Sequence, residues 1–277
     1  MYELMIILGV LCPALAAGII GLWNSRHAGA VALGLGFIAG FIVIKGVPPV
    51  IPTEASQWLP IAAVLFLLLE ISGVFKGAGS VKQWLLRTLL LLIIYVVMLL
   101  PAFQYDWEPL GGLLRVAAAV VLTLLFWAGI QRDMKQQELR PALLRLWLVA
   151  VGGSLLLVFA GSVVLAQLAG AMAAAVAALL IVVWWRGYTA MAASIPAVFT
   201  VLFGGLFVIA WYFAELPVLT AGLLAVAPMA GRLIPASLEQ HWPESRRQAI
   251  RVLLLLIPIA VSLYIGVIST PSFDEYY

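Results

Sequence analysis

Charge is what this sequence has least of. Only 10% of its 277 residues are Asp, Glu, Lys or Arg, whereas 65% are hydrophobic, and the mean hydropathy is +1.16. Soluble domains carry about 25% charged residues, so the composition excludes an ordinary water-soluble fold. The net charge of +3 comes from basic residues scattered over short polar segments. Such scatter reflects orientation in a membrane, and no nucleic-acid partner is predicted.

Cysteine and histidine are almost as scarce. Cys12 is the single cysteine, so neither an intrachain disulfide nor a cysteine-based metal site is predicted. The two histidines, His27 and His241, lie in polar segments and lack the spacing of a metal-binding helix motif. The sequence contains no GxSxG, HExxH or phosphate-binding glycine loop. We therefore expect no cofactor, no metal and no catalytic residue, and we do not expect an enzyme.

Long apolar runs occur along the whole chain, and each is long enough to cross a bilayer as a helix. The sequence predicts an all-α, polytopic transmembrane helix bundle in a single integral membrane domain, residues 1–277. Its ten predicted spans cover about residues 2–22, 28–44, 58–75, 84–100, 110–130, 143–166, 171–185, 191–213, 218–233 and 249–268. The halves 1–130 and 146–277 are joined by the polar segment Gln131–Arg145, which is predicted to be a cytoplasmic loop.

Residues 143–185 form one nearly uninterrupted apolar run. As a single helix these residues would extend about 64 Å, roughly twice the thickness of the hydrocarbon core. The run must therefore fold back, and the sequence Gln-Leu-Ala-Gly at 167–170 is the predicted turn.

The basic residues predict the orientation. With ten spans and the N-terminus outside, 13 of the 15 Lys and Arg residues fall on the cytoplasmic side, as the positive-inside rule requires. Those residues are Arg26, Lys76, Lys82, Arg87, Arg132, Lys135, Arg140, Arg145, Arg186, Arg232, Arg246, Arg247 and Arg251. Both termini are then non-cytoplasmic. Short loops and the lack of a soluble domain favour the bacterial cytoplasmic membrane.

Lys45 and Arg115 are the two basic residues predicted outside, and with Glu54 and Asp106 they form a candidate outer cluster. The alternative is that Lys45 and Arg115 merely extend to the interface from the ends of their spans.

Glu70 is the most unusual ionisable residue, because it lies inside the apolar sequence LFLLLEISGVF. A carboxylate at such a depth indicates a proton or cation path. The structural alternative is that Glu70 reaches water or pairs with Lys76 near the cytoplasmic end of its span.

Two functions are compatible with these features. Five spans in each half would enter the membrane in opposite senses, as in permeases built from inverted repeats. The layout resembles the drug/metabolite transporter superfamily in span number and length, although that superfamily keeps both termini in the cytoplasm. The alternative is a non-catalytic subunit of a larger membrane complex, with protein partners bound through the aromatic outer loop 103–109 and the tail 272–277. A continuous polar or aromatic lining through the bundle would favour the permease.

Overall fold

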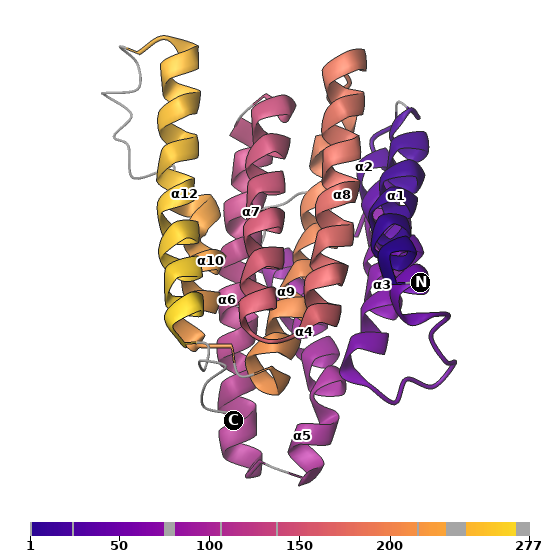
Figure 1. Cartoon of the computed structure of the whole chain (residues 1–277), viewed down its shortest axis with the longest axis vertical. Helices are drawn as coiled ribbons and strands as arrows, with labels where there is room; N and C mark the ends of the chain where they lie inside the picture. Colours follow the sequence, from indigo (N-terminus) through magenta and orange to yellow (C-terminus); the bar gives the residue numbers. More distant parts are fainter. Residues whose placement is uncertain are drawn as a thin grey trace.

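The structure is a computed structural model that describes residues 2–23, 25–74, 81–105, 107–136, 138–214, 216–230 and 242–269, and these contain no β-strand. Figure 1 shows the helices packed side by side as one bundle. In chain order they are α1 (Tyr2–Gly21), α2 (Ala28–Lys45), the 3-10 helix η1 (Ala55–Gln57), α3 (Trp58–Ile71), α4 (Val81–Met98), α5 (Leu100–Tyr105), α6 (Pro109–Gln136), α7 (Leu139–Phe159), α8 (Val163–Arg186), η2 (Ala190–Ala193), α9 (Ile195–Phe213), α10 (Val218–Ala230) and α12 (Glu244–Ser269).

Seven of the described helices, namely α2, α4, α6, α7, α8, α9 and α12, are long and apolar enough to cross a membrane. Three shorter apolar helices lie at Ile7–Gly21, Ala55–Ile71 and Val218–Ala230. Each of these segments overlaps one of the predicted spans. The all-helical fold class is therefore confirmed for the described residues, and its long apolar helices are compatible with a multi-pass membrane protein. The count of ten crossings stays a prediction.

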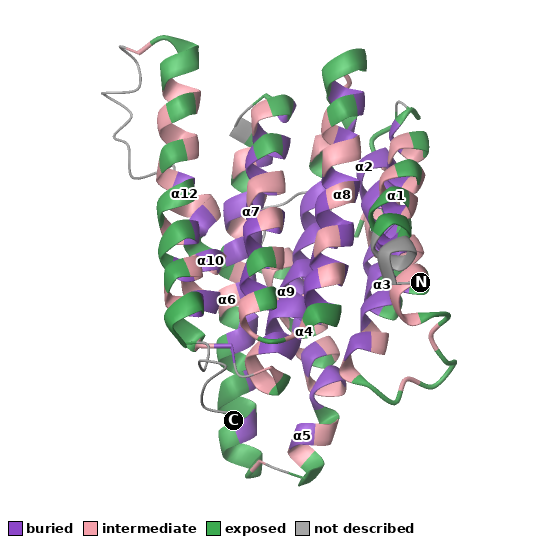
Figure 2. Ribbon diagram, in the orientation of Figure 1, coloured by how far each residue is buried: buried purple, intermediate pink, exposed green. Residues whose placement is uncertain are grey.

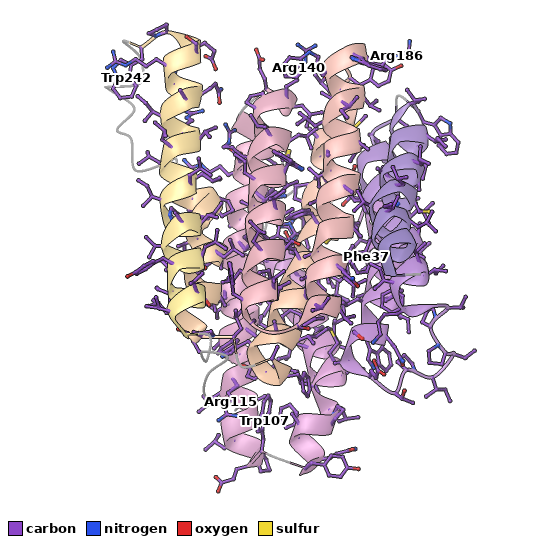
Figure 3. All side chains as sticks on the ribbon, viewed as in Figure 1. Phe37, Trp107, Arg115, Arg140, Arg186 and Trp242 are labelled. Atoms are coloured by element: carbon purple, nitrogen blue, oxygen red, sulfur yellow. The ribbon has the colours of Figure 1, made fainter. Side chains whose placement is uncertain are left out.

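The long helices run in alternating directions, so polar residues collect at two opposite ends of the bundle. Arg140 and Arg186 lie at one end, here called the Arg186 end, and Trp107 and Arg115 lie at the other, here called the Arg115 end (Figure 3). Lys45, the last residue of α2, faces the Arg115 end with the 46–57 segment. Which end faces the cytoplasm stays a prediction from the charge distribution.

Helix α9 forms the centre of the bundle. Every residue from Ile195 to Ala210 is buried, whereas outer helices such as α12 expose apolar faces (Figure 2). A helix that is apolar on all sides is stable only when it is surrounded by other helices or by lipid. The apolar sequence of α9 is compatible with this central position.

The turn predicted at residues 167–170 is wrong. Helix α7 ends at Phe159, and α8 begins at Val163 and continues through Gln167 and Gly170. The chain reverses at Gly161, whose φ of 75° lies in the left-handed region that glycine adopts without steric cost. The resulting helices of 21 and 24 residues both match the roughly 20 residues that a bilayer requires.

The polar segment Gln131–Arg145 is mostly helical, which also differs from the predicted loop. Residues 131–136 continue α6, and residues 139–145 begin α7. The two helices therefore extend past the ends of their predicted spans, and the charged side chains of Asp133 and Arg145 pair between the helices.

Small residues bring α2 and α8 into close contact. A Cβ atom added to Gly40 would lie 2.6 Å from the Cβ of Ala171, and one added to Gly36 would lie 3.1 Å from the Cβ of Ala175. Each helix thus contributes two small residues spaced four apart, a pattern that lets helix backbones approach closely in membranes.

Candidate functional site

Lys45 and Glu54 form an ion pair at the Arg115 end. The Lys45 Nζ also donates a hydrogen bond to Ser56 Oγ at 2.8 Å. The loop that carries Glu54 is fixed by Gln57, whose Oε1 accepts hydrogen bonds from the backbone N of Thr53 at 2.8 Å and of Glu54 at 3.3 Å. Hydrogen bonding to Lys45, followed by its charge, lowers the pKa of Glu54, so the carboxylate stays ionised at neutral pH.

This ion pair lines a cavity of about 380 Å³ between α2, η1, α8 and α9. Its polar residues are Lys45, Thr53, Glu54, Ser56 and Ser162, and its apolar residues include Pro101, Val164, Leu165, Ile209 and Phe213. The volume falls within the roughly 300–1,000 Å³ of small-molecule sites. A mostly apolar lining with a few polar and charged groups is also typical of such sites.

Arg115 does not join this cavity. Its guanidinium lies 5.1 Å from the ring centroid of Trp107, which is within cation–π distance. The Trp107 ring in turn meets Tyr212 edge-on at 4.8 Å and Phe103 at 5.3 Å. The predicted outer cluster is therefore divided into an ion pair at Lys45 and an aromatic group at Arg115, and Asp106 lies outside the described residues.

Glu70 lies toward the opposite end, near the C-terminus of α3, and interacts electrostatically with Arg87 of α4. Arg87 is only 1% exposed. Its guanidinium lies 4.9 Å from the Trp84 ring and 4.5 Å from the Trp127 ring, and it donates a hydrogen bond to Gln131 Oε1 at 2.9 Å. Lys76, the partner expected for Glu70, lies outside the described residues.

Arg145 is a second buried arginine that sequence analysis placed in a loop. It binds both carboxylate oxygens of Asp133, with Nε–Oδ2 and Nη2–Oδ1 distances of 2.9 and 3.0 Å. It also donates to Gln248 Oε1 at 2.8 Å, and this bond connects α7 to α12. The sequence contained one signal that both arginines are buried. Each follows two leucines and is itself followed within two residues by an apolar stretch.

Aromatic rings occur along α6 and α9 between the two ends of the bundle, in separate groups of contacting rings. From the Arg115 end, Trp107 contacts Tyr212, which stacks on Trp211 at 4.6 Å. Phe207, Phe203 and Phe199 follow along α9 at centroid separations of 4.8 and 5.2 Å, and Phe126 of α6 stacks on Phe203 at 5.5 Å. Trp127, the neighbour of Phe126, lies beneath Arg87. We call this set of rings the aromatic column.

A small cavity of about 40 Å³ opens beside the aromatic column between α6, α9 and α10. Among its lining residues are Thr123, Phe203, Gly204, Phe207 and Trp211. Thr123 Oγ1 bonds to Tyr95 Oη at 2.9 Å and donates to Ala119 O at 2.8 Å. This hydroxyl pair places a polar point beside the mostly apolar lining of the small cavity.

Among the residues that the structure describes, no group of three or more His, Cys, Asp or Glu side chains is placed to hold a metal ion. No model of a known protein family matches the sequence, and no curated protein matches it either.

Proposed function

We propose that the protein is a multi-pass permease of a bacterial cytoplasmic membrane, and that a small solute crosses along the aromatic column. The observation that carries this proposal is the distribution of aromatic rings along α6 and α9, from Trp107 beside Arg115 to Trp127 beside Arg87. A permease requires such a lining, whereas a purely structural bundle does not.

Aromatic rings can interact favourably with a solute inside a membrane. Their faces attract cationic and polarised groups, and their edges and bodies accept apolar groups. The 40 Å³ cavity beside Thr123 is large enough for a water molecule or a small chemical group. It provides an intermediate position between the two arginines, with one hydroxyl pair available as a polar contact.

Helix α10 is the element whose movement would widen this route. Pro228 lies inside α10, and a proline within a helix removes one backbone hydrogen bond and favours a kink. The proline packs against α6 at Gly129, where an added Cβ would lie 3.2 Å from Pro228 Cβ. Glu70, beside Arg87, is the proposed proton-coupling group.

Transport into proteoliposomes tests the proposal. Purified protein is reconstituted, and uptake of radiolabelled phenylalanine, benzoate and phenethylamine is measured against protein-free liposomes. Gly204→Ala should lower uptake several-fold, because the new Cβ would lie 2.8 Å from Tyr95 Oη. Phe203→Leu provides a milder change in the same column, and Gly222→Ala, with nothing within 4 Å, is the control. Uptake no greater than in protein-free liposomes would contradict the proposal.

The Glu70→Gln variant distinguishes proton-driven uptake from movement of the solute through the protein. The variant should abolish uptake driven by a proton gradient, while exchange of labelled for unlabelled solute persists. Normal gradient-driven uptake by well-expressed Glu70→Gln protein would remove Glu70 from the mechanism.

A second candidate, a non-catalytic subunit of a membrane complex, is favoured by the exposed surface of α12. Leu253, Ile257 and Tyr264 are 61%, 57% and 67% exposed. Tyr105, in the predicted outer loop 103–109 but helical as the last residue of α5, is 84% exposed, and the tail 272–277 lies outside the described residues. Purification in mild detergent with mass spectrometry distinguishes the two functions, because a stoichiometric partner supports the subunit and a chain without partners supports the permease.

A further inference from the structure

The cavity at Lys45 and Glu54 lies on the side of α9 away from the 40 Å³ cavity, because Ile209 and Phe213 line the former and Phe207 and Trp211 line the latter. It is a separate feature, and nothing in the proposed route requires it. Its volume of about 380 Å³ is that of a small-molecule site, and its lining residues determine which ligand it can bind.

Two opposite charges are presented side by side at its polar wall. The Lys45 ammonium has three N–H donors, and its bonds to Glu54 and Ser56 use two of them. The Glu54 side chain is 58% exposed and that of Lys45 is 21% exposed, so both remain accessible from the cavity. An ion pair this exposed contributes little to stability, and a ligand can therefore separate the two groups at small cost.

The Lys45–Glu54 pair determines which charged groups a bound ligand can carry. A simple anion would gain from Lys45 but would face the Glu54 carboxylate, and a simple cation would gain from Glu54 but would face the ammonium. A zwitterion satisfies both groups, with its carboxylate on Lys45 and Ser56 Oγ and its ammonium on Glu54. Charge-assisted hydrogen bonds of this kind are stronger than those between neutral groups.

The apolar residues of the lining determine which side group the ligand can carry. Leu165, Ile209 and Phe213 give the cavity an apolar surface, which favours a ligand with an apolar side group by the hydrophobic effect. We infer that the cavity between α2, η1, α8 and α9 binds a zwitterionic α-amino acid with an apolar side chain. The ammonium and carboxylate bind to Glu54 and Lys45, and the side chain packs against Leu165 and Phe213.

Three compounds with the same apolar body test this inference by binding alone. Full-length protein in phosphatidylglycerol nanodiscs is titrated with phenylalanine, with 3-phenylpropionate, which lacks the ammonium, and with phenethylamine, which lacks the carboxylate. Leucine serves as a second zwitterion. We expect phenylalanine or leucine to bind and to raise the Tm, with at least tenfold weaker binding of the two single-charge compounds. Equal binding of all three phenyl compounds, or no binding of either amino acid, would overturn the inference.

Variants test whether the amino acid binds at Lys45 and Glu54. Lys45→Met and Glu54→Gln should each weaken amino-acid binding at least tenfold. The matched controls Lys135→Met and Glu138→Gln alter exposed residues at the opposite end and should leave binding unchanged. Binding unaffected by Lys45→Met and Glu54→Gln, in variants whose melting is cooperative, would contradict the assignment.

Phosphatidylethanolamine carries the same pair of charges in its headgroup, so the titration is repeated in nanodiscs that contain it. A Tm rise produced by this lipid, with none from phenylalanine or leucine, would assign the cavity to a lipid and overturn the inference. The binding assay and the uptake assay test the two proposals separately. Binding of an amino acid without uptake would reject only the permease. Uptake without binding at Lys45 and Glu54 would reject only the amino-acid site.

Discussion

The two buried arginines are accommodated by different chemistry. Arg87 has its guanidinium next to two tryptophan rings and one amide oxygen, whereas Arg145 has a bidentate carboxylate and a second amide oxygen. A buried charge is tolerated only when it is paired and hydrogen-bonded. Both residues therefore hold together helices that are far apart in the chain, α4 with α6 and α7 with α12.

Removal of the Asp133 charge should destabilise the bundle. Asp133→Asn leaves the Arg145 guanidinium, only 5% exposed, without its counter-charge, at a cost of about 3 kcal/mol. Equilibrium unfolding in mixed detergent micelles measures this loss. The double variant Asp133→Leu with Arg145→Met should recover much of it, because no uncompensated charge remains. A double variant less stable than Asp133→Asn would contradict this account.

The Lys45–Glu54 pair predicts a pH dependence. Because the pKa of Glu54 in the folded protein lies below its ordinary value of 4.5, its contribution to stability is present above that value and is lost as the pH falls through the lowered pKa. The Tm of wild type should exceed that of Glu54→Gln by on the order of 1 °C at pH 7, and this difference should shrink as the pH is lowered below 4.5. In a Lys45→Met background the difference should be absent throughout.

At the scale of elements, the contact of α2 with α8 depends on residues that lack side chains beyond Cβ. Lipid is as apolar as the helix surfaces, so helices associate in a membrane through close packing more than through the hydrophobic effect. Gly36 and Gly40 of α2 against Ala171 and Ala175 of α8 provide such packing.

Two glycine-to-alanine substitutions should therefore have opposite effects. Gly40→Ala would bring two Cβ atoms to 2.6 Å, and such overpacking costs about 1–3 kcal/mol. At Gly222 in α10 nothing lies within 4 Å, so alanine should stabilise the protein by roughly 0.5 kcal/mol through helix propensity. Thermal unfolding of both variants in the same detergent tests this, and equal shifts would show that α2 and α8 can move apart freely.

The helices themselves could be predicted from apolar length, but the α7–α8 turn could not. Gln167 was the most polar residue of the run beyond Arg145, yet backbone conformation decided the turn, since Gly161 accepts a positive φ and Gln167 remains helical. The segment Gln131–Arg145 was misinterpreted for a related reason: a polar sequence predicts contact with water or polar partners, and here Arg145 finds Asp133 inside the helix packing.

The candidate site was predictable only where its residues are close in sequence. Lys45 and Glu54 are separated by nine positions, both were placed in the candidate outer cluster, and the structure shows them paired. Arg87 and Gln131 are 44 positions apart, and the cavity wall combines α2, α8 and α9. These contacts depend on how helices pack, which apolar periodicity in a membrane protein does not encode.

For the whole molecule, the charge distribution predicts the side on which each end of the bundle lies. In a Cys12→Ser background, a membrane-impermeant maleimide added to intact cells should label Tyr105→Cys, at the Arg115 end, but not Lys135→Cys, near the end of α6. Labelling of both should occur after the cells are opened. The reverse pattern would place the termini in the cytoplasm.

Helices α5 and α6 together form a hairpin that extends beyond the rest of the bundle at the Arg115 end (Figure 1). With 28 residues, α6 is about 42 Å long, well beyond the roughly 30 Å hydrocarbon core. A small, loop-poor membrane protein gives electron microscopy little outside the micelle by which to align particles. This hairpin, whose Phe103 and Trp107 rings pack together and onto Tyr212 of α9, is an exposed site for grafting a fiducial domain or raising a conformation-specific nanobody.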